Sequence, residues 1–277
     1  MNQIFGVIGD PIAHSMSPDM HNDSFQHLGI EATYLPFAVR SENLQDAVKG
    51  MKAIGVKGFN VTIPHKTAIM PFLDKIDPLA ADIGAVNTVK LEDGFYVGYN
   101  TDGLGFVKGL SEQLHASLKE QKVLVIGAGG AARAIYYSLL QEGASHVDVT
   151  NRTLPKAAEL IAEKTGNAHS LIYTLAEAEA RLSEYTLIIN TTSIGMQPNI
   201  DEAPISLENI RPQSLVSDII YNPLQTKLLQ EAAKKNALTQ NGIPMFVYQG
   251  ALAFQLWTGK QPDIDRMRKI VLTKLGG

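Results

Sequence analysis

One stretch, residues 122–152, constrains the fold of this chain more than any other. It reads KVLVIGAGGAARAIYYSLLQEGASHVDVTNR, with a short apolar run (123–126), a glycine-rich turn, a helical pattern through Leu140 that Gly143 ends, and a second β-like run (147–149). A strand, a tight turn, a helix and a second strand in this order form half of a dinucleotide-binding fold. The alternative is a glycine-rich turn in an ordinary βαβ unit.

The residues of the glycine-rich turn have separable physical roles. Gly127 permits the sharp turn off the strand, and Gly129 lets a pyrophosphate approach the backbone because glycine has no Cβ. Ala132 occupies the third glycine position of the motif, where alanine is also accepted. The helix that begins near Gly130 directs free N–H groups and its positive dipole end at the phosphates. These features predict a nucleotide cofactor.

The end of the second strand indicates which nucleotide is bound. NAD enzymes usually carry an Asp or Glu there for the ribose 2′-OH, whereas an Arg accommodates the 2′-phosphate of NADP. This strand ends in Asn151, Arg152 and Thr153, and Lys156 lies just beyond. Asp148 lies inside the strand, too early to reach the ribose. Because a guanidinium binds phosphate with two hydrogen bonds, we expect NADP rather than NAD. The alternative makes Arg152 and Lys156 two solvated charges flanking the next helix.

Length and composition limit the class of protein. The chain has 277 residues, about right for two domains, and its 45% hydrophobic and 19% charged residues are ordinary for globular proteins. A net charge of −4 implies no basic field for nucleic acid. The lack of cysteine excludes disulfides, thiolate zinc sites and a Cys nucleophile, and it fits a cytoplasmic protein. We expect no signal peptide and no membrane span.

The order of predicted elements indicates an α/β fold. Predicted strands lie at 3–9, 32–39, 58–63 and 85–89, with a hairpin partner at 96–99 after the Asp93-Gly94 turn. Helices alternate with them, which argues for an α/β domain with a largely parallel sheet. After the glycine-rich unit come predicted strands at 187–190 and 215–219, and then helices at 226–236, 244–258 and 263–275. With the cofactor unit in the middle, we expect the terminal helices to return to the first domain.

Eight short motifs stand in one order along the chain: Ser15-Met16-Ser17-Pro18, Asn60-Val61-Thr62-Ile63-Pro64-His65-Lys66, Gly84-Ala85-Val86-Asn87-Thr88, Asn100-Thr101-Asp102-Gly103, Gly127-Ala128-Gly129-Gly130-Ala131, Asn151-Arg152-Thr153, Asn190-Thr191-Thr192 and Tyr248-Gln249-Gly250-Ala251. With them, the chain resembles the shikimate dehydrogenases over essentially its whole length. The resemblance implies NADP-dependent, reversible reduction of 3-dehydroshikimate to shikimate, a step of aromatic amino-acid biosynthesis. It also implies two α/β domains with a cleft between them. We expect a substrate-binding and catalytic domain at 1–103 plus 238–277, and a Rossmann-like NADP-binding domain at 104–237.

Reduction of a ketone by hydride makes an alkoxide, so the site needs a proton donor beside that oxygen and a base for the reverse direction. Lys66 is the candidate and Asp102 its partner, because both come just after strand ends, where α/β sheets gather their ligands. A carboxylate beside the ammonium would orient it and favour its charged form. The sequence leaves open which of the two exchanges the proton. Lys66 could also be a solvated lysine, and Asp102 only a helix cap.

The resemblance assigns substrate and cofactor residues by position. For the substrate carboxylate it indicates Ser15 and Ser17, although Ser17 is otherwise explained as the N-cap before Pro18. For the ring hydroxyls, and for contact with substrate or ribose, the candidates are Asn60, Thr62, Asn87, Gln249 and Tyr221. For the cofactor they are Gly127, Ala128, Gly129, Gly130, Ala131, Asn151, Arg152, Thr153, Lys156, Thr191, Gly242 and Met245. Turn formation, strand ends and packing are the alternative explanations.

The sequence is compared with three alternative functions. A quinate/shikimate dehydrogenase with NAD preference is the nearest, and Arg152 argues against it. A methylene-tetrahydrofolate dehydrogenase conflicts with the Ser-x-Ser-Pro and Asn-x-Thr-x-Pro-x-Lys motifs. A non-catalytic NADP-binding sensor would not need both Lys66 and Asp102.

We expect no metal, because His14, His21 and His65 do not stand at metal-ligand spacing with carboxylates. The expected partner is a small-molecule substrate, and we expect no binding to nucleic acid or membrane. We expect the chain to be a monomer or homodimer.

Overall fold

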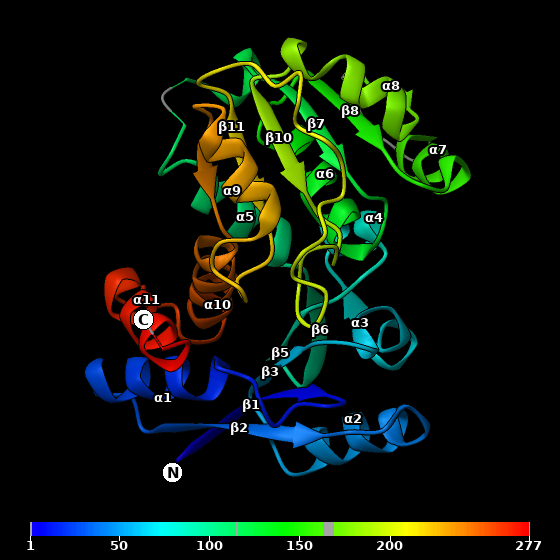
Figure 1. The fold of residues 1–277 in the computed structure, drawn as a ribbon. Coiled ribbons are helices and arrows are strands. Elements are labelled where there is room, and N and C mark those ends of the chain that lie inside the picture. The colour runs from blue at the N-terminus through cyan, green and yellow to red at the C-terminus, as the bar shows by residue number, and fades with distance from the viewer. Residues whose placement is uncertain (1, 115, 163–168, 277) are drawn as a thin grey trace. The chain divides into compact units, whose positions relative to one another are not determined.

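The computed structural model describes the whole chain except residues 1, 115, 163–168 and 277 (Figure 1). The chain divides into two compact units. The first unit comprises Met1–Thr101 and Val247–Gly277, and the second comprises Asp102–Phe246. The first unit is therefore discontinuous in sequence, and each unit contains its own β-sheet. In the described part of the chain, no helix has both the length and the apolar character needed to cross a membrane.

The first unit is built on a six-stranded sheet with the order β2-β1-β3-β5-β6-β4. The strands are β1 (Gln3–Gly9), β2 (Ala32–Ala38), β3 (Gly58–Val61), β4 (Lys75–Ile76), β5 (Thr88–Glu92) and β6 (Phe95–Tyr99). β1 pairs in parallel with β2 and β3, and β4 with β6, while β5 is antiparallel to β3 and β6. The predicted hairpin is confirmed: Asp93 and Gly94 turn the chain with positive φ angles of 48° and 84°.

Helices cover both faces of this sheet: α1 (Ser17–His27), α2 (Leu44–Ala53), α3 (His65–Ala68), α4 (Pro78–Ile83), α11 (Ile264–Lys274) and the later part of α10 (Ile243–Thr258). α1 and α11 lie side by side (Figure 1). Trp257 on α10 donates its indole N–H to the carbonyl of Val89 at 2.9 Å. A Cβ at Gly58 would lie 2.3 Å from the Trp257 nitrogen, so only glycine lets α10 pack this closely on the sheet.

The second unit contains a parallel sheet with the order β12-β11-β10-β7-β8-β9. Its strands are β7 (Lys122–Ile126), β8 (His146–Thr150), β9 (Ile172–Tyr173), β10 (Leu187–Asn190), β11 (Leu215–Asp218) and β12 (Leu238–Gln240). The chain enters at β7 in the middle, moves outward through β8 and β9, and then crosses to β10 on the other side. This is the strand order of a Rossmann fold, with its topological switch point between β7 and β10. The expected α/β class with a Rossmann-like domain is confirmed.

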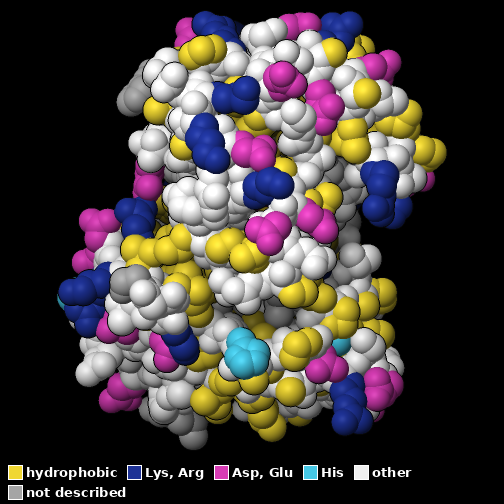
Figure 2. Space-filling view, in the orientation of Figure 1, with side chains coloured by type: hydrophobic (Ala, Val, Ile, Leu, Met, Phe, Trp, Pro, Cys, Tyr) yellow, Lys and Arg dark blue, Asp and Glu magenta, His cyan; other side chains and the backbone are white. Residues whose placement is uncertain are grey.

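The helices of the second unit are α5 (Asp102–Leu110), α6 (Gly130–Gln141), α7 (Leu154–Ala162), α8 (Leu175–Ala180) and α9 (Lys227–Lys234). One face of the sheet buries Leu124, Ile126, Ile188 and Val216 against side chains of α8 and α9. On α5, a Cβ at Gly103 would lie 2.1 Å from a backbone oxygen of α6, so this glycine permits the close helix crossing. Figure 2 shows that acidic and basic side chains are interspersed over the visible face of the molecule.

Candidate functional site

The glycine-rich turn lies at the carboxyl end of β7, beside the switch point of the second unit. Gly127 has a φ of 114°, which favours glycine, and its N–H donates to the carbonyl of Thr150 at 2.8 Å. A Cβ on Gly127 would lie 2.5 Å from the hydroxyl oxygen of Thr191, which follows β10. The turn is therefore held between the ends of the two strands that flank β7, and no larger residue fits at its first position.

The next two glycines face open space. A Cβ at Gly129 or Gly130 would meet no atom within 4 Å, and both residues are exposed. Gly129 is the N-cap of α6 and supplies no side chain to the first N–H groups of that helix. Ala128 and Ala131 are half-buried, and Ala132 is buried where the helix packs on the sheet. The start of α6 thus presents backbone donors and a positive dipole end to whatever approaches.

The end of β8 carries cations and no exposed carboxylate. Arg152, Thr153 and Lys156 are exposed, and the Asn151 side chain donates to the carbonyl of Thr153 at 2.8 Å. Asp148 is fully buried and accepts hydrogen bonds from other parts of the unit. Asp148 lies inside β8, as expected, and its side chain is engaged within the unit.

Thr191 closes the switch point from the other side. Its N–H and its hydroxyl both donate to the carbonyl of Ile126, at 2.9 and 2.7 Å. Because the hydroxyl proton is donated to Ile126, the Thr191 side chain could contact a cofactor in this geometry only as a hydrogen-bond acceptor. Its role as a cofactor residue stays a prediction.

Three further predicted residues lie around the start of α10. The ring of Tyr221 packs against Phe246 at 5.3 Å between centroids, and burial raises the pKa of its hydroxyl. A Cβ on Gly242 would lie 2.0 Å from the carbonyl oxygen of Ile219, so packing alone explains this glycine. Met245 is half-buried on the first turn of α10. Contact of these residues with substrate or nicotinamide stays a prediction.

In the first unit, Tyr34 connects predicted substrate residues. Its hydroxyl donates to the side-chain oxygen of Asn60 at 2.7 Å. Burial raises the pKa of Tyr34 well above its ordinary value, and a hydrogen bond from Ser17 acts in the opposite direction. The Asn60 amide nitrogen donates to the carbonyl of Asn87 at 3.2 Å and to the hydroxyl of Thr88 at 3.0 Å. Both ends of the Asn60 amide are therefore engaged.

Asn87 extends this chain of contacts toward Asp102. Its side-chain oxygen accepts from the Thr88 hydroxyl at 3.0 Å and from the backbone N–H of Thr101 at 2.8 Å. Its amide nitrogen donates to the Thr101 hydroxyl at 3.0 Å. We call the residues of this chain the buried polar network: Ser17, Tyr34, Asn60, Asn87, Thr88 and Thr101. A network in which each member is hydrogen-bonded fixes its side chains in one arrangement.

The expected cap at Ser17 is wrong. The structure places Ser17 inside α1 as its first residue, with Met16 at the N-cap position and no side-chain cap hydrogen bond. The backbone N–H of Ser17 instead donates to the hydroxyl oxygen of Ser15 at 3.3 Å. Pro18 needs no N–H donor at the start of the helix, which leaves fewer groups for a cap to satisfy. The hydroxyl of Ser17 is thus available to the buried polar network rather than used for capping.

Lys66 is half-buried on the short helix α3, directly after β3. His65, the preceding residue, anchors the helix because its Nε2 lies 2.6 Å from the carbonyl of Val39. The backbone carbonyl of Lys66 accepts from the N–H of Val86 at 2.8 Å. The base of the lysine side chain is thereby fixed on two sides. Thr62 and Gln249 are also half-buried, on the loop before α3 and on α10.

Asp102 is the first residue of α5, and the residue is only 9% exposed. A carboxylate in the first helical turn is stabilised by the helix dipole. The preceding residue, Thr101, is held by the Asn87 side chain. The segment Val86–Asn87 therefore supports the backbone of Lys66 directly and that of Asp102 through its neighbour.

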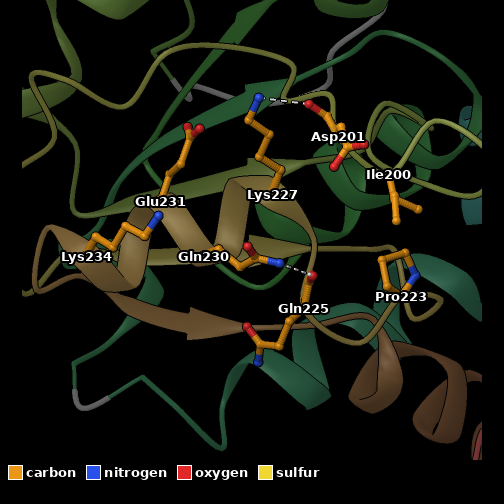
Figure 3. Close-up of a pocket in the computed structure, with 8 residues that line it drawn as sticks. All are labelled: Ile200, Asp201, Pro223, Gln225, Lys227, Gln230, Glu231 and Lys234. Atoms are coloured by element: carbon orange, nitrogen blue, oxygen red, sulfur yellow. Dashed lines mark hydrogen bonds between the residues drawn. The ribbon is translucent and has the colours of Figure 1, made fainter.

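A cavity of about 340 Å³ on the second unit lies apart from these residues. Figure 3 shows it along α9, with Lys227 donating to the carbonyl of Asp201 and Gln230 donating to that of Gln225. Ile200 and Pro223 line its other side. None of the site residues predicted from the sequence lines this cavity.

Sequence models of three parts of one family match the chain. The shikimate dehydrogenase substrate binding domain matches residues 7–89, the shikimate / quinate 5-dehydrogenase model residues 109–219, and the shikimate 5'-dehydrogenase C-terminal domain residues 242–272. The shikimate dehydrogenase (NADP(+)) of Geobacillus sp. (strain WCH70) is 54% identical over 277 residues, 100% of both chains. The chain belongs to the shikimate dehydrogenase family.

Solved structures of family members have the same fold. A shikimate dehydrogenase in complex with NADP+ has a TM-score of 0.91 and 44% identity, over 99% of this chain and 96% of that one. The shikimate 5-dehydrogenase of Listeria monocytogenes, in complex with shikimate and NAD, has a TM-score of 0.91 and 36% identity, over 98% of this chain and 96% of that one. The family expected from the motifs is therefore confirmed.

The residues of this shikimate dehydrogenase family member fit the NADP that the family implies. The space in front of Gly129 is open, and the N-terminus of α6 has no side-chain cap. Arg152 is exposed just after the carboxyl end of β8. A pyrophosphate needs the first two features, and a 2′-phosphate needs the third.

Sequence reasoning missed several residues of these sites. Thr88 and Thr101 belong to motifs that the chain shares with the family, but those motifs do not indicate that both residues hydrogen-bond to Asn87. Tyr34 falls within the predicted strand at 32–39, and a tyrosine hydroxyl in a buried strand signals a polar partner. Asp218, at the end of β11, falls within the predicted strand at 215–219, and that pattern does not indicate its buried hydrogen bonds.

The buried carboxyl of Asp218 should make stability depend on pH. It accepts from Asn190, from the backbone of Ile220 and from Thr226, yet burial dominates and raises its pKa from 3.8 to about 6. The folded state thus binds this proton more tightly than the unfolded state. The contribution of Asp218 is most favourable below pH 4 and is lost as pH rises to about 6, by about 3 kcal/mol.

Asp218→Asn removes the ionisation while keeping an oxygen for Asn190 and Ile220. In urea unfolding at several pH values, the variant should gain stability relative to the unchanged chain as pH rises from 4 to 6. The exposed Asp201→Asn serves as the matched control and should follow the unchanged chain. A constant difference between Asp218→Asn and the unchanged chain over this range would contradict the expectation.

Proposed function

We propose that this chain catalyses the NADP-dependent, reversible reduction of 3-dehydroshikimate to shikimate, a step of aromatic amino-acid biosynthesis. The observation that carries the cofactor assignment is the end of β8, where exposed Arg152 and Lys156 stand in place of the carboxylate typical of NAD enzymes. The full-length relative at 54% identity, which is named for NADP(+), supports the same activity. No comparable observation favours a quinate enzyme or a sensor.

The second unit would hold the cofactor. The backbone of Gly129, Gly130 and Ala131 at the start of α6 binds the pyrophosphate. Arg152 binds the 2′-phosphate with two hydrogen bonds, and Lys156 adds a second positive charge. When bound, NADPH supplies the hydride that reduces the ketone. The other cofactor contacts proposed from the family are Gly127, Ala128, Asn151, Thr153, Thr191, Gly242 and Met245.

The first unit would bind the substrate by hydrogen bonds. Ser15 donates to the carboxylate, and Ser17 donates to it when its hydroxyl turns away from Tyr34, while Thr62 and Gln249 contact ring hydroxyls. Asn60 and Asn87 do so with the capacity that the buried polar network leaves them, and the network holds both amides in position. A site of this kind discriminates strongly against substrates that lack a hydroxyl. Tyr221 contributes a contact from the second unit.

Lys66 and Asp102 handle the proton. In the direction of reduction, the carbonyl oxygen gains negative charge as the hydride arrives at carbon, and a proton passes to that oxygen from the pair. In the reverse direction the pair accepts it. Lys66 suits this role because Val86 holds its backbone and His65 anchors its helix, and Asp102 because it is buried at a helix start. Which of the two exchanges the proton is a question for mutagenesis.

The predicted domain assignment is part of the proposal. We predict a substrate-binding and catalytic domain at 1–103 plus 238–277 and an NADP-binding domain at 104–237. The compact units divide instead after Thr101 and before Val247, so that β12 belongs to the second unit's sheet. A protein of this function would work in the cytoplasm, as a monomer or homodimer.

The test is a spectrophotometric assay of reduced nicotinamide, with shikimate and quinate each offered with NADP and with NAD. We expect strong turnover with shikimate and NADP and little with any other pair. Preferred turnover of quinate with NAD would overturn the specificity while leaving the reaction class intact. Binding of NADPH without turnover of either substrate would instead support a sensor.

A further inference from the structure

Three potential metal ligands converge at the end of the second unit's sheet where its strands begin. His146 is the first residue of β8, and Asp148 follows two positions later, so both side chains stand on the same face of the strand. His169 pairs with His146 in a parallel bridge just before β9. One ligand atom from each of the three lies within 4.8 Å of the other two.

The spacing of these atoms is close to that of a tetrahedral zinc site. Zinc lies about 2.0–2.2 Å from histidine nitrogen and carboxylate oxygen, so two of its ligand atoms are separated by about 3.4 Å. The His146 Nε2 atom lies 3.4 Å from Asp148 Oδ2. The rings of His146 and His169 are 4.7 Å apart between centroids. A rotation of the His169 side chain would bring its nitrogen to the distance that a shared zinc ion requires.

The carboxylate is already oriented by the surrounding protein. Asp148 is fully buried, and it accepts from the backbone N–H of Leu171 at 2.8 Å and from the hydroxyl of Tyr185 at 2.8 Å. Contacts of this kind to a metal ligand hold it in place and raise its affinity for the ion. The carboxylate also lies close to the ligand nitrogens of His146 and His169.

The His146 nitrogen faces the Asp148 carboxylate at 3.4 Å without a hydrogen bond. Its Nε2 is buried and makes no hydrogen bond to any described residue. An ion pair between His146 and Asp148 would explain these two residues. It would not explain why His169 places a second imidazole within 4.8 Å of them. A divalent ion uses all three groups and satisfies the buried nitrogen. The nearby cation Lys122 is ion-paired with Glu184 at 2.5 Å, which reduces its repulsion of an ion.

We propose that His146, Asp148 and His169 bind a divalent transition-metal ion, with zinc the best fit to two imidazoles and one carboxylate. A water molecule would complete the tetrahedron, and the exposed side chain of His169 leaves the site accessible from solvent. The ion would join β8 to the segment that leads into β9. The site lies at the amino ends of the strands, opposite Gly127 and Arg152 at their carboxyl ends, so its role is structural rather than catalytic.

The test is calorimetric titration of the full chain with Zn²⁺, after removal of metal by a chelator and without a histidine tag. The titration is run near pH 7.5, because a proton on imidazole competes with the metal ion for its ligand nitrogen. We expect one zinc per chain, and a melting temperature that rises by several degrees when free zinc exceeds Kd about 100-fold. Absence of zinc binding would overturn the proposal.

Variants identify the ligands. His169→Ala, at an exposed position, should weaken zinc binding about 100-fold or more and abolish the rise in melting temperature, and His146→Ala should do the same. Tyr185→Phe, which removes one hydrogen bond to Asp148, should weaken binding about 10-fold. The control His27→Ala, an exposed histidine on α1, should bind zinc unchanged. Equal zinc affinity in His169→Ala and the unchanged chain would overturn the assignment.

Discussion

Replacing Lys66 with alanine is expected to lower kcat about 100-fold or more, the usual scale of acid–base assistance. The substrate KM should change much less, because Ser15, Ser17 and Gln249 retain their proposed contacts. The reason is that the alkoxide formed by hydride addition loses its proton donor, while the ground-state complex loses only one contact among several. Steady-state kinetics with shikimate and NADP measure both constants.

Two controls make this result specific to Lys66. Lys49→Ala removes an exposed lysine from α2 and should leave both constants unchanged. The melting temperature of Lys66→Ala should stay close to that of the unchanged chain, because the backbone bonds of α3 do not involve the lysine head group. Unchanged turnover in Lys66→Ala would remove the residue from the mechanism.

The double variant tests whether Lys66 and Asp102 act as one unit. Asp102→Asn keeps the size of the side chain and removes its charge. If the two residues handle one proton together, Lys66→Ala combined with Asp102→Asn should be little slower than the slower single variant. Losses that multiply would show that the two residues contribute independently.

Local features of the chain were sufficient to predict much of the second unit. A strand, Gly127, the helix at Gly130 and the stop at Gly143 each follow from near neighbours in sequence, and all four appear in the structure. The hairpin around Gly94 was predictable for the same reason. The strand order β12-β11-β10-β7-β8-β9 could not be read from local features, since pairing between distant strands leaves no local signal.

Contacts between distant residues explain what the sequence did not reveal. Tyr34 meets Asn60 across 26 positions, and Asn87 meets Thr101 across 14, so neither pair forms a periodic pattern. The resemblance named Asn60 and Asn87 as substrate residues without indicating that each already has partners. His169 and Asp148 likewise come together only through the pairing of β8 with the segment before β9.

Arg152→Ala is expected to raise the KM for NADPH about 10-fold or more while leaving the KM for NADH nearly unchanged. A hydrogen bond to a charged group contributes about 1.5–3 kcal/mol, and Arg152 would make two of them to a group that NADH lacks. Because Arg152 is exposed, its removal should not disturb the fold. Both constants come from steady-state kinetics of 3-dehydroshikimate reduction.

Two further variants, Lys156→Ala and Arg211→Ala, test whether the effect on the KM for NADPH is specific to Arg152. Lys156→Ala should raise the KM for NADPH less than Arg152→Ala does, because an ammonium acts on the 2′-phosphate as a point charge without a bidentate fork. Arg211→Ala removes an exposed arginine that precedes β11, at the amino end of the strand, and should change neither KM. Equal effects of Arg152→Ala on NADPH and NADH would mean that the residue stacks on or orients the adenosine common to both. The preference for NADP would then have to arise elsewhere in the second unit.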